Sequence, residues 1–218
     1  MKREWKLFIH DIYDAIRYIK EFVGTMKRKE FLADERLITR ATGFSCQWTE
    51  GESVTTIWSH LTTDEARNAM ICDDVFQNLK ENRFPIILTE RKEHLELLRF
   101  RLEGLVKHLV ILHGGMRAPK RREMLAKLAD VPGNEERLIL ATGPYIGEGF
   151  DDPRLDTLFL VMPFSFRGKM VQYAGRLHRH FEGKTEVRIY DYVDSMPILE
   201  KMYKKRLKAY KALGYEET

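Results

Sequence analysis

Between residues 64 and 213, short apolar runs alternate with longer segments whose apolar residues recur at helical spacing. Each run has the length of a buried strand. Alternating strands and helices predict an α/β fold: a parallel sheet with helices on both faces and right-handed crossovers. The expected strands are 85–89, 108–112, 138–141, 155–162 and 186–193. The expected helices are 64–80, 90–105, 119–128, 168–181 and 197–213.

Composition sets only broad limits. The 218 residues suit one domain with an appendage, and a hydrophobic content of 44% suffices for a core. A net charge of +4 permits nucleic-acid binding without requiring it. Cys46 and Cys72 form neither a metal pattern nor a disulfide framework, so we expect free thiols and a cytoplasmic protein. No apolar stretch approaches the ~18 residues that span a bilayer, so we expect no membrane partner.

The motif richest in chemistry is the octapeptide 172–179, QYAGRLHR, which fits Q-x-x-G-R-x-x-R. On a helix, its fixed positions Gln172, Gly175, Arg176 and Arg179 would share one face. Two guanidiniums and an amide on one face suit the charge of a transferring phosphoryl group, which is the chemistry of an arginine finger. The alternative interpretation is a solvated basic helix.

A second motif lies in the segment 138–162, LILATGPYIGEGFDDPRLDTLFLVM. An apolar run stops at Thr142-Gly143-Pro144, a polar loop follows with Gly147, Gly149 and Asp151, and a second apolar run begins at Leu155. Ligands of open α/β sheets sit at the carboxyl ends of strands. We therefore expect Thr142, Asp151 and the helix of Arg176 near one edge of the sheet.

Together these segments resemble the second RecA-like lobe of a superfamily 2 helicase or translocase, of the restriction-type DEAD/DEAH-like kind. Residues 172–179 resemble motif VI, and residues 141–151 resemble motif V. Residues 85–98 resemble the motif IV strand with its helix, and residues 110–116 resemble the HG-containing strand end that follows. Four motifs in the family's order cover residues 63–218, which the resemblance makes a helicase C-terminal domain.

In that family the ATPase site lies between two lobes, and the resemblance implies roles for residues of this lobe. Arg179 would be the arginine finger, and Arg176 its partner on the phosphates or on lobe 1. Gln172 would line the same cleft. Gly149 and Asp151 would lie near the ribose and the lobe interface.

The resemblance also implies a nucleic-acid track, with DNA preferred. Thr142 and Gly143 match the end of motif V that faces the nucleic-acid backbone. Thr89 and Gly114 match strand-end positions that contact phosphates of one strand. Hydroxyls and backbone N–H groups hold a backbone there without reading its sequence.

Lobe 1 itself is missing from the pattern. The one Gly-Lys-Thr, residues 183–185, follows His178 where a phosphate loop needs glycine, so we expect a turn. Asp64-Glu65-Ala66-Arg67 follows no buried strand, and we expect the acidic first turn of a helix capped by Thr62 or Thr63. ATP with magnesium would then be held mainly by a Walker A/B lobe supplied in trans or by a longer parent chain.

The first 36 residues depart from this pattern. Residues 3–23 form a strongly amphipathic helical pattern, and the segment resembles the N-terminus of HepT-like proteins of the HEPN superfamily. The arginine–histidine pair of that family belongs to a late helix that has no counterpart here. Residues 37–62 are expected to be a linker or a short pair of strands.

Three functional hypotheses remain open. The first is the C-terminal half of an ATP-dependent helicase or translocase. The second is a non-catalytic nucleic-acid-binding or regulatory module, for which the basic clusters at 120–122 and 201–211 would contact phosphates instead of forming solvated faces. The third is a remnant of a HepT-like toxin–antitoxin ribonuclease fused to a helicase fragment.

Overall fold

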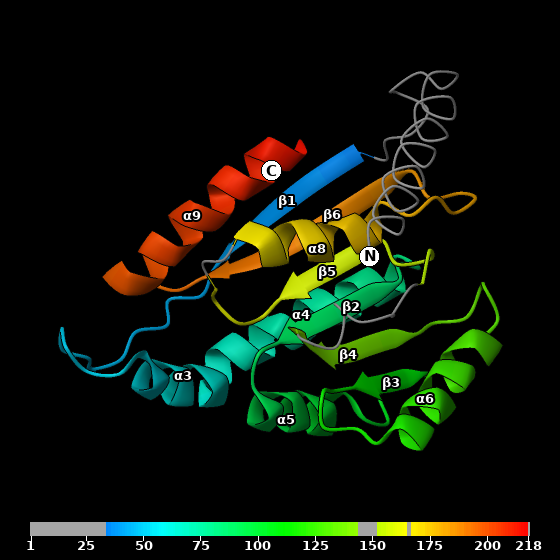
Figure 1. Cartoon of the computed structure of the whole chain (residues 1–218), viewed down its shortest axis with the longest axis horizontal. Helices are drawn as coiled ribbons and strands as arrows, with labels where there is room; N and C mark the ends of the chain where they lie inside the picture. Colours follow the sequence, from blue (N-terminus) through cyan, green and yellow to red (C-terminus); the bar gives the residue numbers. More distant parts are fainter. Residues whose placement is uncertain (1–33, 144–151, 165–166, 218) are drawn as a thin grey trace, which may run out of the picture. The chain divides into compact units, whose positions relative to one another are not determined.

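The structure, a computed structural model that describes residues 34–143, 152–164 and 167–217, is built on a seven-stranded sheet (Figure 1). The strand order is β3-β4-β2-β5-β6-β1-β7, and each pair of neighbours runs parallel. The strands are β1 (Asp34–Ala41), β2 (Pro85–Thr89), β3 (Leu109–Leu112), β4 (Leu138–Thr142), β5 (Thr157–Leu160), β6 (Glu186–Val193) and β7 (Glu216–Glu217). The predicted parallel α/β sheet is confirmed.

Helices cover both faces of this sheet (Figure 1). One face carries α4 (Glu65–Lys80) and α5 (Lys92–Leu102), which pack on Leu138 and Leu140 of β4. Because side chains alternate along a strand, Ile139 and Ala141 point to the opposite face. That face carries α6 (Ala118–Asp130), α8 (Arg167–Leu177) and α9 (Pro197–Leu213). Among the residues that the structure describes, one further helix is α3 (Val54–Thr63).

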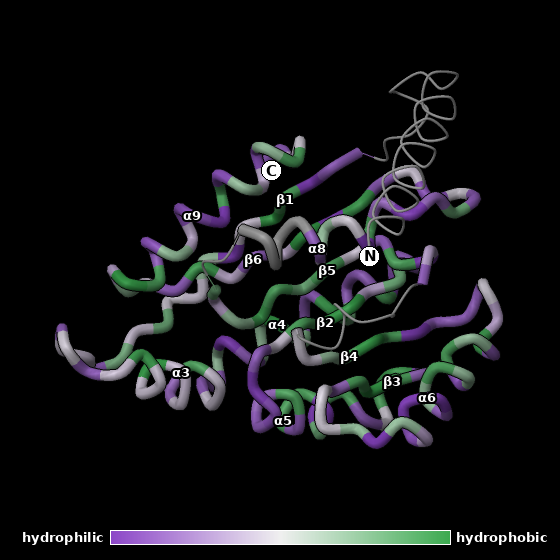
Figure 2. The backbone as a smooth tube through the Cα atoms, viewed as in Figure 1, coloured by the Kyte–Doolittle hydropathy of each residue, from purple (hydrophilic) through white to green (hydrophobic). Residues whose placement is uncertain are grey.

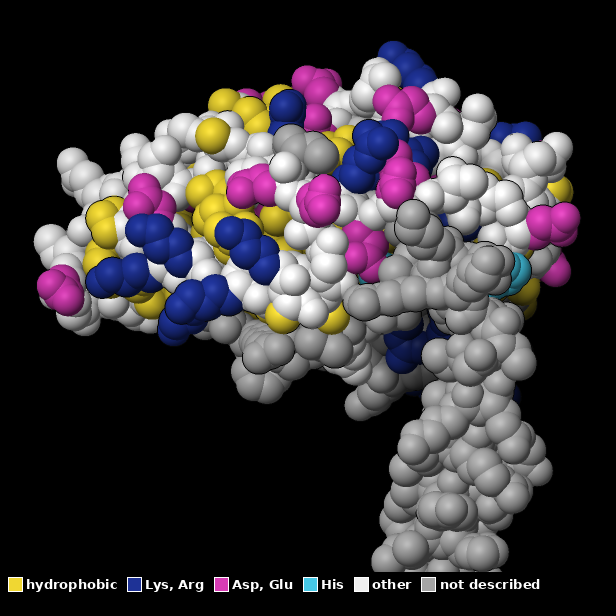
Figure 3. Space-filling model, turned by 90° about the horizontal axis from the view of Figure 1, so that it is seen from above, with side chains coloured by type: hydrophobic (Ala, Val, Ile, Leu, Met, Phe, Trp, Pro, Cys, Tyr) yellow, Lys and Arg dark blue, Asp and Glu magenta, His cyan; other side chains and the backbone are white. Residues whose placement is uncertain are grey.

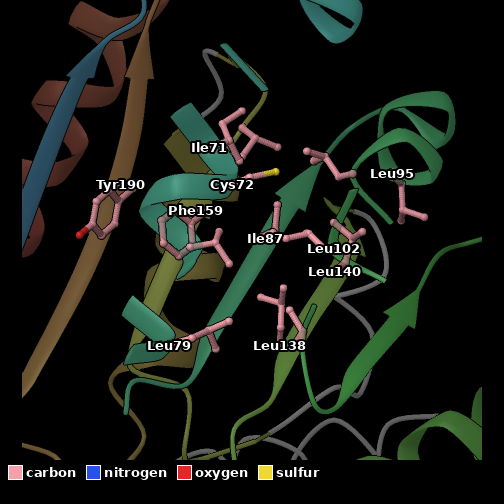
Figure 4. Close-up of a cluster of buried hydrophobic side chains, with 14 of the residues drawn as sticks. Ile71, Cys72, Leu79, Ile87, Leu95, Leu102, Leu138, Leu140, Phe159 and Tyr190 are labelled. Atoms are coloured by element: carbon pink, nitrogen blue, oxygen red, sulfur yellow. The ribbon is translucent and has the colours of Figure 1, made fainter. Parts of the chain in front are cut away.

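The main core lies between the sheet and the helices α4 and α5 (Figure 4). It is aliphatic around Ile87 and Leu95, and the stacked rings of Phe159 and Tyr190 close it toward β6, with centroids 4.5 Å apart. Hydrophobic residues are concentrated in the central strands of the sheet (Figure 2). A second cluster joins α3 to the carboxyl ends of β1, β5 and β6, through Phe44, Ile57, Leu61, Met162, Met196 and Leu199.

Two buried ion pairs tie helices to strand ends. The Arg67 guanidinium of α4 lies 2.8 Å from Asp194, just beyond β6, and also donates to the carbonyl of Val161. The Arg206 guanidinium of α9 lies 2.7 Å from the Asp191 carboxylate of β6. All four charged side chains are at most 3% exposed. Burial makes each partner depend on the other, since an unpaired buried charge is costly.

Several expectations about the elements need correction. Residues 37–62 are not simply a linker, because β1 starts at Asp34 and α3 occupies 54–63. The sequence of β1, DERLITRA, hides the strand because only Leu37 is buried in it. The first 33 residues, with the HepT-like pattern, lie outside the described residues.

Helix ends follow local chemistry. The α4 helix does begin at the Asp64 region, but its N-cap is Asp64 itself, whose carboxylate accepts the Arg67 N–H at 2.8 Å. The α9 helix ends at Gly214, which takes φ 98° in the left-handed region, as expected. The α5 helix stops at Leu102, short of the expected residue 105, and Gly104 follows with φ 81°. No described helix is long and apolar enough to cross a membrane.

Candidate functional site at the carboxyl edge of the sheet

Three neighbouring strands bring the predicted strand-end residues together. In the sheet, Thr89 at the end of β2 is in register with Thr142 at the end of β4. Gly114 follows β3, and its N–H donates to the Thr142 hydroxyl at 3.2 Å. Gly114 is exposed, and nothing stands within 4 Å of where its Cβ would be. The edge therefore offers an open backbone loop fixed to the end of β4.

The Thr89 side chain, by contrast, points inward. It is 1% exposed, and its hydroxyl accepts the Arg91 N–H and lies 3.2 Å from the His94 Nδ1. The opposite ring nitrogen of His94 lies 2.9 Å from the amide oxygen of Asn68. Because an amide oxygen only accepts, Nε2 carries the proton and Nδ1 accepts from Thr89. The Thr89 hydroxyl is therefore turned away from the surface, where the expected contact with a phosphate would lie, and it supports the turn between β2 and α5.

His94 is held neutral in this network. Burial, together with the positive charges of Arg67 and Arg101, lowers the pKa of His94 to about 3. A neutral ring keeps its acceptor nitrogen toward Thr89. The network Asn68–His94–Thr89 therefore fixes the turn between β2 and α5 from below.

Gly143 connects this edge to the motif VI helix. It follows β4 directly, and a Cβ on it would collide with both the Glu90 carboxylate and the Tyr173 hydroxyl. The Tyr173 hydroxyl of α8 donates to Glu90 at 3.4 Å. Burial and the Glu90 charge raise the pKa of Tyr173, so its hydroxyl keeps its proton. No sequence pattern pointed to Glu90 or Tyr173, although both adjoin residues of the predicted site.

The motif VI residues lie on the outer side of α8 and just beyond it. Gln172 and Gly175 are exposed, and Arg176 is partly exposed with no carboxylate partner among the described residues. The helix ends at Leu177 instead of the expected residue 181, so Arg179 lies in the following bend. The expected single helical face thus holds for Gln172, Gly175 and Arg176, while Arg179 is exposed from a non-helical backbone.

Two contacts explain the early end of α8. The Lys184 ammonium donates to the carbonyls of Leu177 and Arg179 at 3.0 and 2.7 Å. These carbonyls lie where a helix end leaves acceptors unsatisfied. On the other side, the His178 ring lies 3.0 Å from the Tyr215 hydroxyl. The Gly-Lys-Thr tripeptide is the expected turn, with Gly183 at φ 82°.

The remaining predicted residues, Gly149 and Asp151, lie outside the described residues. The next residue, Asp152, is buried and pairs with Arg154 at 2.7 Å. Arg154 also donates to the carbonyls of Val131 and Leu128 at the end of α6. This end of the motif V segment is thereby fixed to α6, a role that the Asp-Asp-Pro-Arg sequence alone does not reveal.

Two arginines of this region bear on the expected binding of ATP with magnesium. Arg176 and Arg179 present guanidiniums suited to phosphate oxygens. Among the residues that the structure describes, no group of three or more His, Cys, Asp or Glu side chains could hold a metal ion.

Comparison with known families gives one match, to the family described as "Helicase conserved C-terminal domain", over residues 66–181. The chain is 39% identical over 82 residues to uncharacterized protein 108L of Invertebrate iridescent virus 3, covering 38% of this chain and 75% of that one. It is 30% identical over 168 residues to putative helicase 161L of Invertebrate iridescent virus 6, covering 72% of this chain and 37% of that one.

Transcript termination protein A18 of cowpox virus (strain Brighton Red) is 28% identical over 125 residues, covering 56% of this chain and 25% of that one. The chain thus spans 25% of the A18 protein and 37% of the 161L protein. Among solved structures, T4 UvsW is similar with a TM-score of 0.63 and 14% identity, over 85% of this chain and 41% of that one.

A structure of S. cerevisiae Dbp5 bound to RNA and ADP BeF3 is similar with a TM-score of 0.56 and 14% identity, over 94% of this chain and 48% of that one. These structural similarities show the fold, which is that of a RecA-like lobe.

Proposed function

Because the chain belongs to the family of helicase conserved C-terminal domains, we propose that it serves as the second lobe of an ATP-dependent nucleic-acid helicase or translocase. One observation carries the proposal. Gly143, between the strand ends and α8, packs against Glu90 and Tyr173, so the edge with Gly114 and Thr142 adjoins the helix with Arg176.

The proposed division of labour follows from the charges at this edge. ATP with magnesium, bound mainly by a Walker A/B lobe, supplies the phosphoryl group whose transfer drives the cycle. Arg179 and Arg176 place positive charge on the phosphate oxygens, and Gln172 lines the same cleft. An exposed guanidinium can do this only when a second lobe closes over it, because water screens an open site.

The same edge would hold a nucleic-acid strand. The exposed loop at Gly114 and Gly115 lets a sugar-phosphate backbone approach closely, and Thr142 keeps that loop in place. Thr89 and His94 support the turn from inside. Such contacts to the backbone bind a strand without reading its bases, and DNA is the track we propose. Gly149 and Asp151 would complete the nucleotide side.

A fusion tests this proposal. The chain would be joined to the Walker A/B lobe of an active superfamily 2 helicase, and ATP turnover measured with and without single-stranded DNA. We expect little turnover from the chain alone and DNA-stimulated turnover from the fusion. Robust turnover by the chain alone would contradict an incomplete site. A folded fusion without turnover, beside an active parent helicase, would contradict the lobe 2 assignment.

A second candidate function, a non-catalytic nucleic-acid-binding module, is favoured by the surface of α9. Five lysines are exposed along this helix, and none has an ion pair to a described carboxylate: Lys201, Lys204, Lys205, Lys208 and Lys211. Basic side chains gather on this side of the molecule (Figure 3). Their neighbour in sequence, Arg206, is buried and belongs to the core.

Salt dependence separates the two functions. If α9 binds phosphates, changing Lys204 and Lys208 to Gln lowers the slope of log affinity against log salt by about one per lost contact. The matched control changes Lys107 and Arg99, which lie outside both basic clusters and already pair with Glu135 and Glu96. Fluorescence anisotropy with labelled DNA measures the slopes. Equal slopes for the two double variants would exclude α9 as the binding surface.

A further inference from the structure

The bend that carries Arg179 is anchored on both sides. His178 points inward, where its Nε2 lies 3.0 Å from the Tyr215 hydroxyl and its side chain is 26% exposed. Arg179 and His180 are exposed. Leu177, the last residue of α8, is 1% exposed. An inward residue on the N-terminal side of Arg179 therefore directs the next side chain to the surface.

The second anchor is the lysine of the turn before β6. Lys184 reaches back over the bend and donates to two carbonyls, that of Leu177 at 3.0 Å and that of Arg179 itself at 2.7 Å. Its own N–H donates to the Phe181 carbonyl at 3.1 Å, which closes the turn around Gly183. An ammonium at the C-terminal end of a helix also offsets the negative end of the helix dipole.

We propose that Lys184 is a positioning residue that fixes the backbone of Arg179, so that the arginine side chain leaves the bend in one direction. Arg179 stands outside the helix, so helical hydrogen bonds do not fix its φ and ψ. Contacts that hold this peptide therefore help to set the direction in which the side chain leaves the bend. Lys184 supplies the contact on the carbonyl side, and the inward ring of His178 supplies the one on the amide side.

The inference rests on the proposed function, because the direction of the Arg179 side chain matters for catalysis only if Arg179 acts on the phosphoryl group. It also explains why a Gly-Lys-Thr tripeptide occurs here without a phosphate loop. The lysine faces backbone carbonyls of the protein, so it does not face a nucleotide. Glycine at position 183 is required by the left-handed turn, whose φ of 82° brings Lys184 back over the bend.

The charge on Lys184 is sensitive to pH. Burial and, to a smaller extent, the charge of Arg83 lower the pKa of Lys184, Asp156 and Asp152 raise it, and the net result is a pKa of about 8. His178, another titratable group beside it, has a pKa lowered by burial and is neutral near pH 8. Above pH 8 the anchor therefore loses its charge, and its bonds to the two carbonyls weaken.

Three variants of the full chain test the inference: Lys184→Met, which removes the donors, Lys184→Arg, which keeps donors and a charge that does not titrate in this range, and Lys80→Met as an exposed control on α4. Amide hydrogen exchange is measured first, on the chain alone. We expect exchange in the last turn of α8, residues 174–178, to rise about 10-fold or more in Lys184→Met. Lys184→Arg should restore most of the protection, and Lys80→Met should leave exchange in α8 unchanged. Unchanged exchange in Lys184→Met would overturn the proposal.

The second readout is ATP turnover of the fusion with a Walker A/B lobe. We expect kcat to fall about 10-fold or more in Lys184→Met with the KM for ATP nearly unchanged, because a misdirected finger loses an interaction made in the transition state. The parent should lose activity above pH 8, whereas Lys184→Arg should not. Faster exchange with unaltered kcat would overturn the positioning role while leaving the finger in place. If Arg179→Ala also left kcat unaltered, the proposed function itself would fail, which is a different result.

Discussion

At the scale of single residues, two glycines of the site have opposite requirements. Gly143 has no room for a side chain, because a Cβ would meet Glu90 and Tyr173. Gly175 is exposed on α8, with nothing within 4 Å of the position that a Cβ would take. Both belong to the motifs that the sequence singles out. The structure therefore separates a glycine needed for packing from one that packing does not require.

We expect Gly143→Ala to lower the free energy of unfolding by about 1–3 kcal/mol, because the methyl group displaces a buried tyrosine. Gly175→Ala should raise it by about 0.5–1 kcal/mol, because alanine favours the helix. Urea denaturation of the two variants beside the parent measures both. Equal effects of the same sign would show that the contact between β4 and α8 is not as tight as the structure has it.

Lowered stability in acid should come partly from His94. Its pKa is about 3 in the folded chain against an ordinary value of 6.5. Between these two pH values, the histidine binds a proton in the unfolded chain but not in the folded chain. Below pH 6.5 the free energy of unfolding then falls, by up to about 1.4 kcal/mol per pH unit from this residue. In His94→Gln this component is absent. We expect the stability advantage of the parent at pH 7 to shrink toward pH 4, and an advantage independent of pH would contradict the buried neutral ring.

At the scale of elements, the ion pair between Arg206 and Asp191 fixes α9 to β6. Replacing Arg206 by Met leaves the Asp191 carboxylate buried without its partner, which should cost about 3–5 kcal/mol. The pair of Arg36 with Glu186 is the matched control, because Arg36 is 47% exposed and its replacement by Met should cost under about 1 kcal/mol. Thermal unfolding of both variants checks the difference. Similar losses of stability in the two variants would mean that burial does not determine how much each ion pair contributes to stability.

Elements with apolar runs were predictable from the sequence, and elements without them were not. The runs at Pro85–Thr89 and Leu138–Thr142 are buried along their whole length, so both strands appear where expected. The β1 strand was not predicted, because most of the side chains of β1 are partly exposed. They are exposed because the outer neighbour of β1, the strand β7, is only two residues long. The position at which α8 ends was not predicted, because Lys184, which donates to the carbonyl of its last residue, lies in a separate turn.

The site was predictable only as a set of positions along one edge. Neighbouring strands bring Thr142 and Gly114 together, which the order of motifs anticipated. The Thr89 side chain points inward because it contacts His94, which in turn contacts Asn68. No local sequence pattern predicts such a buried polar network. Contacts between distant elements, such as Tyr173 with Glu90, require the three-dimensional arrangement.

At the scale of the whole molecule, the proposed activity needs more than this chain. The family match covers residues 66–181, and the chain spans 37% of putative helicase 161L. The edge of the sheet has arginines for phosphates and an open backbone loop for a strand, while the described residues include no cluster suited to a metal ion. In the proposed function, a second lobe faces this edge.

The most direct test is the turnover number of the fusion between this chain and a Walker A/B lobe, compared between Arg179→Ala and Arg121→Ala, an exposed control on α6. We predict that Arg179→Ala lowers kcat by about 10³-fold or more, as loss of an arginine finger does, with DNA affinity nearly unchanged. Arg121→Ala should retain the parent's turnover. Equal turnover in Arg179→Ala and the parent would contradict the central claim that this edge completes an ATPase site.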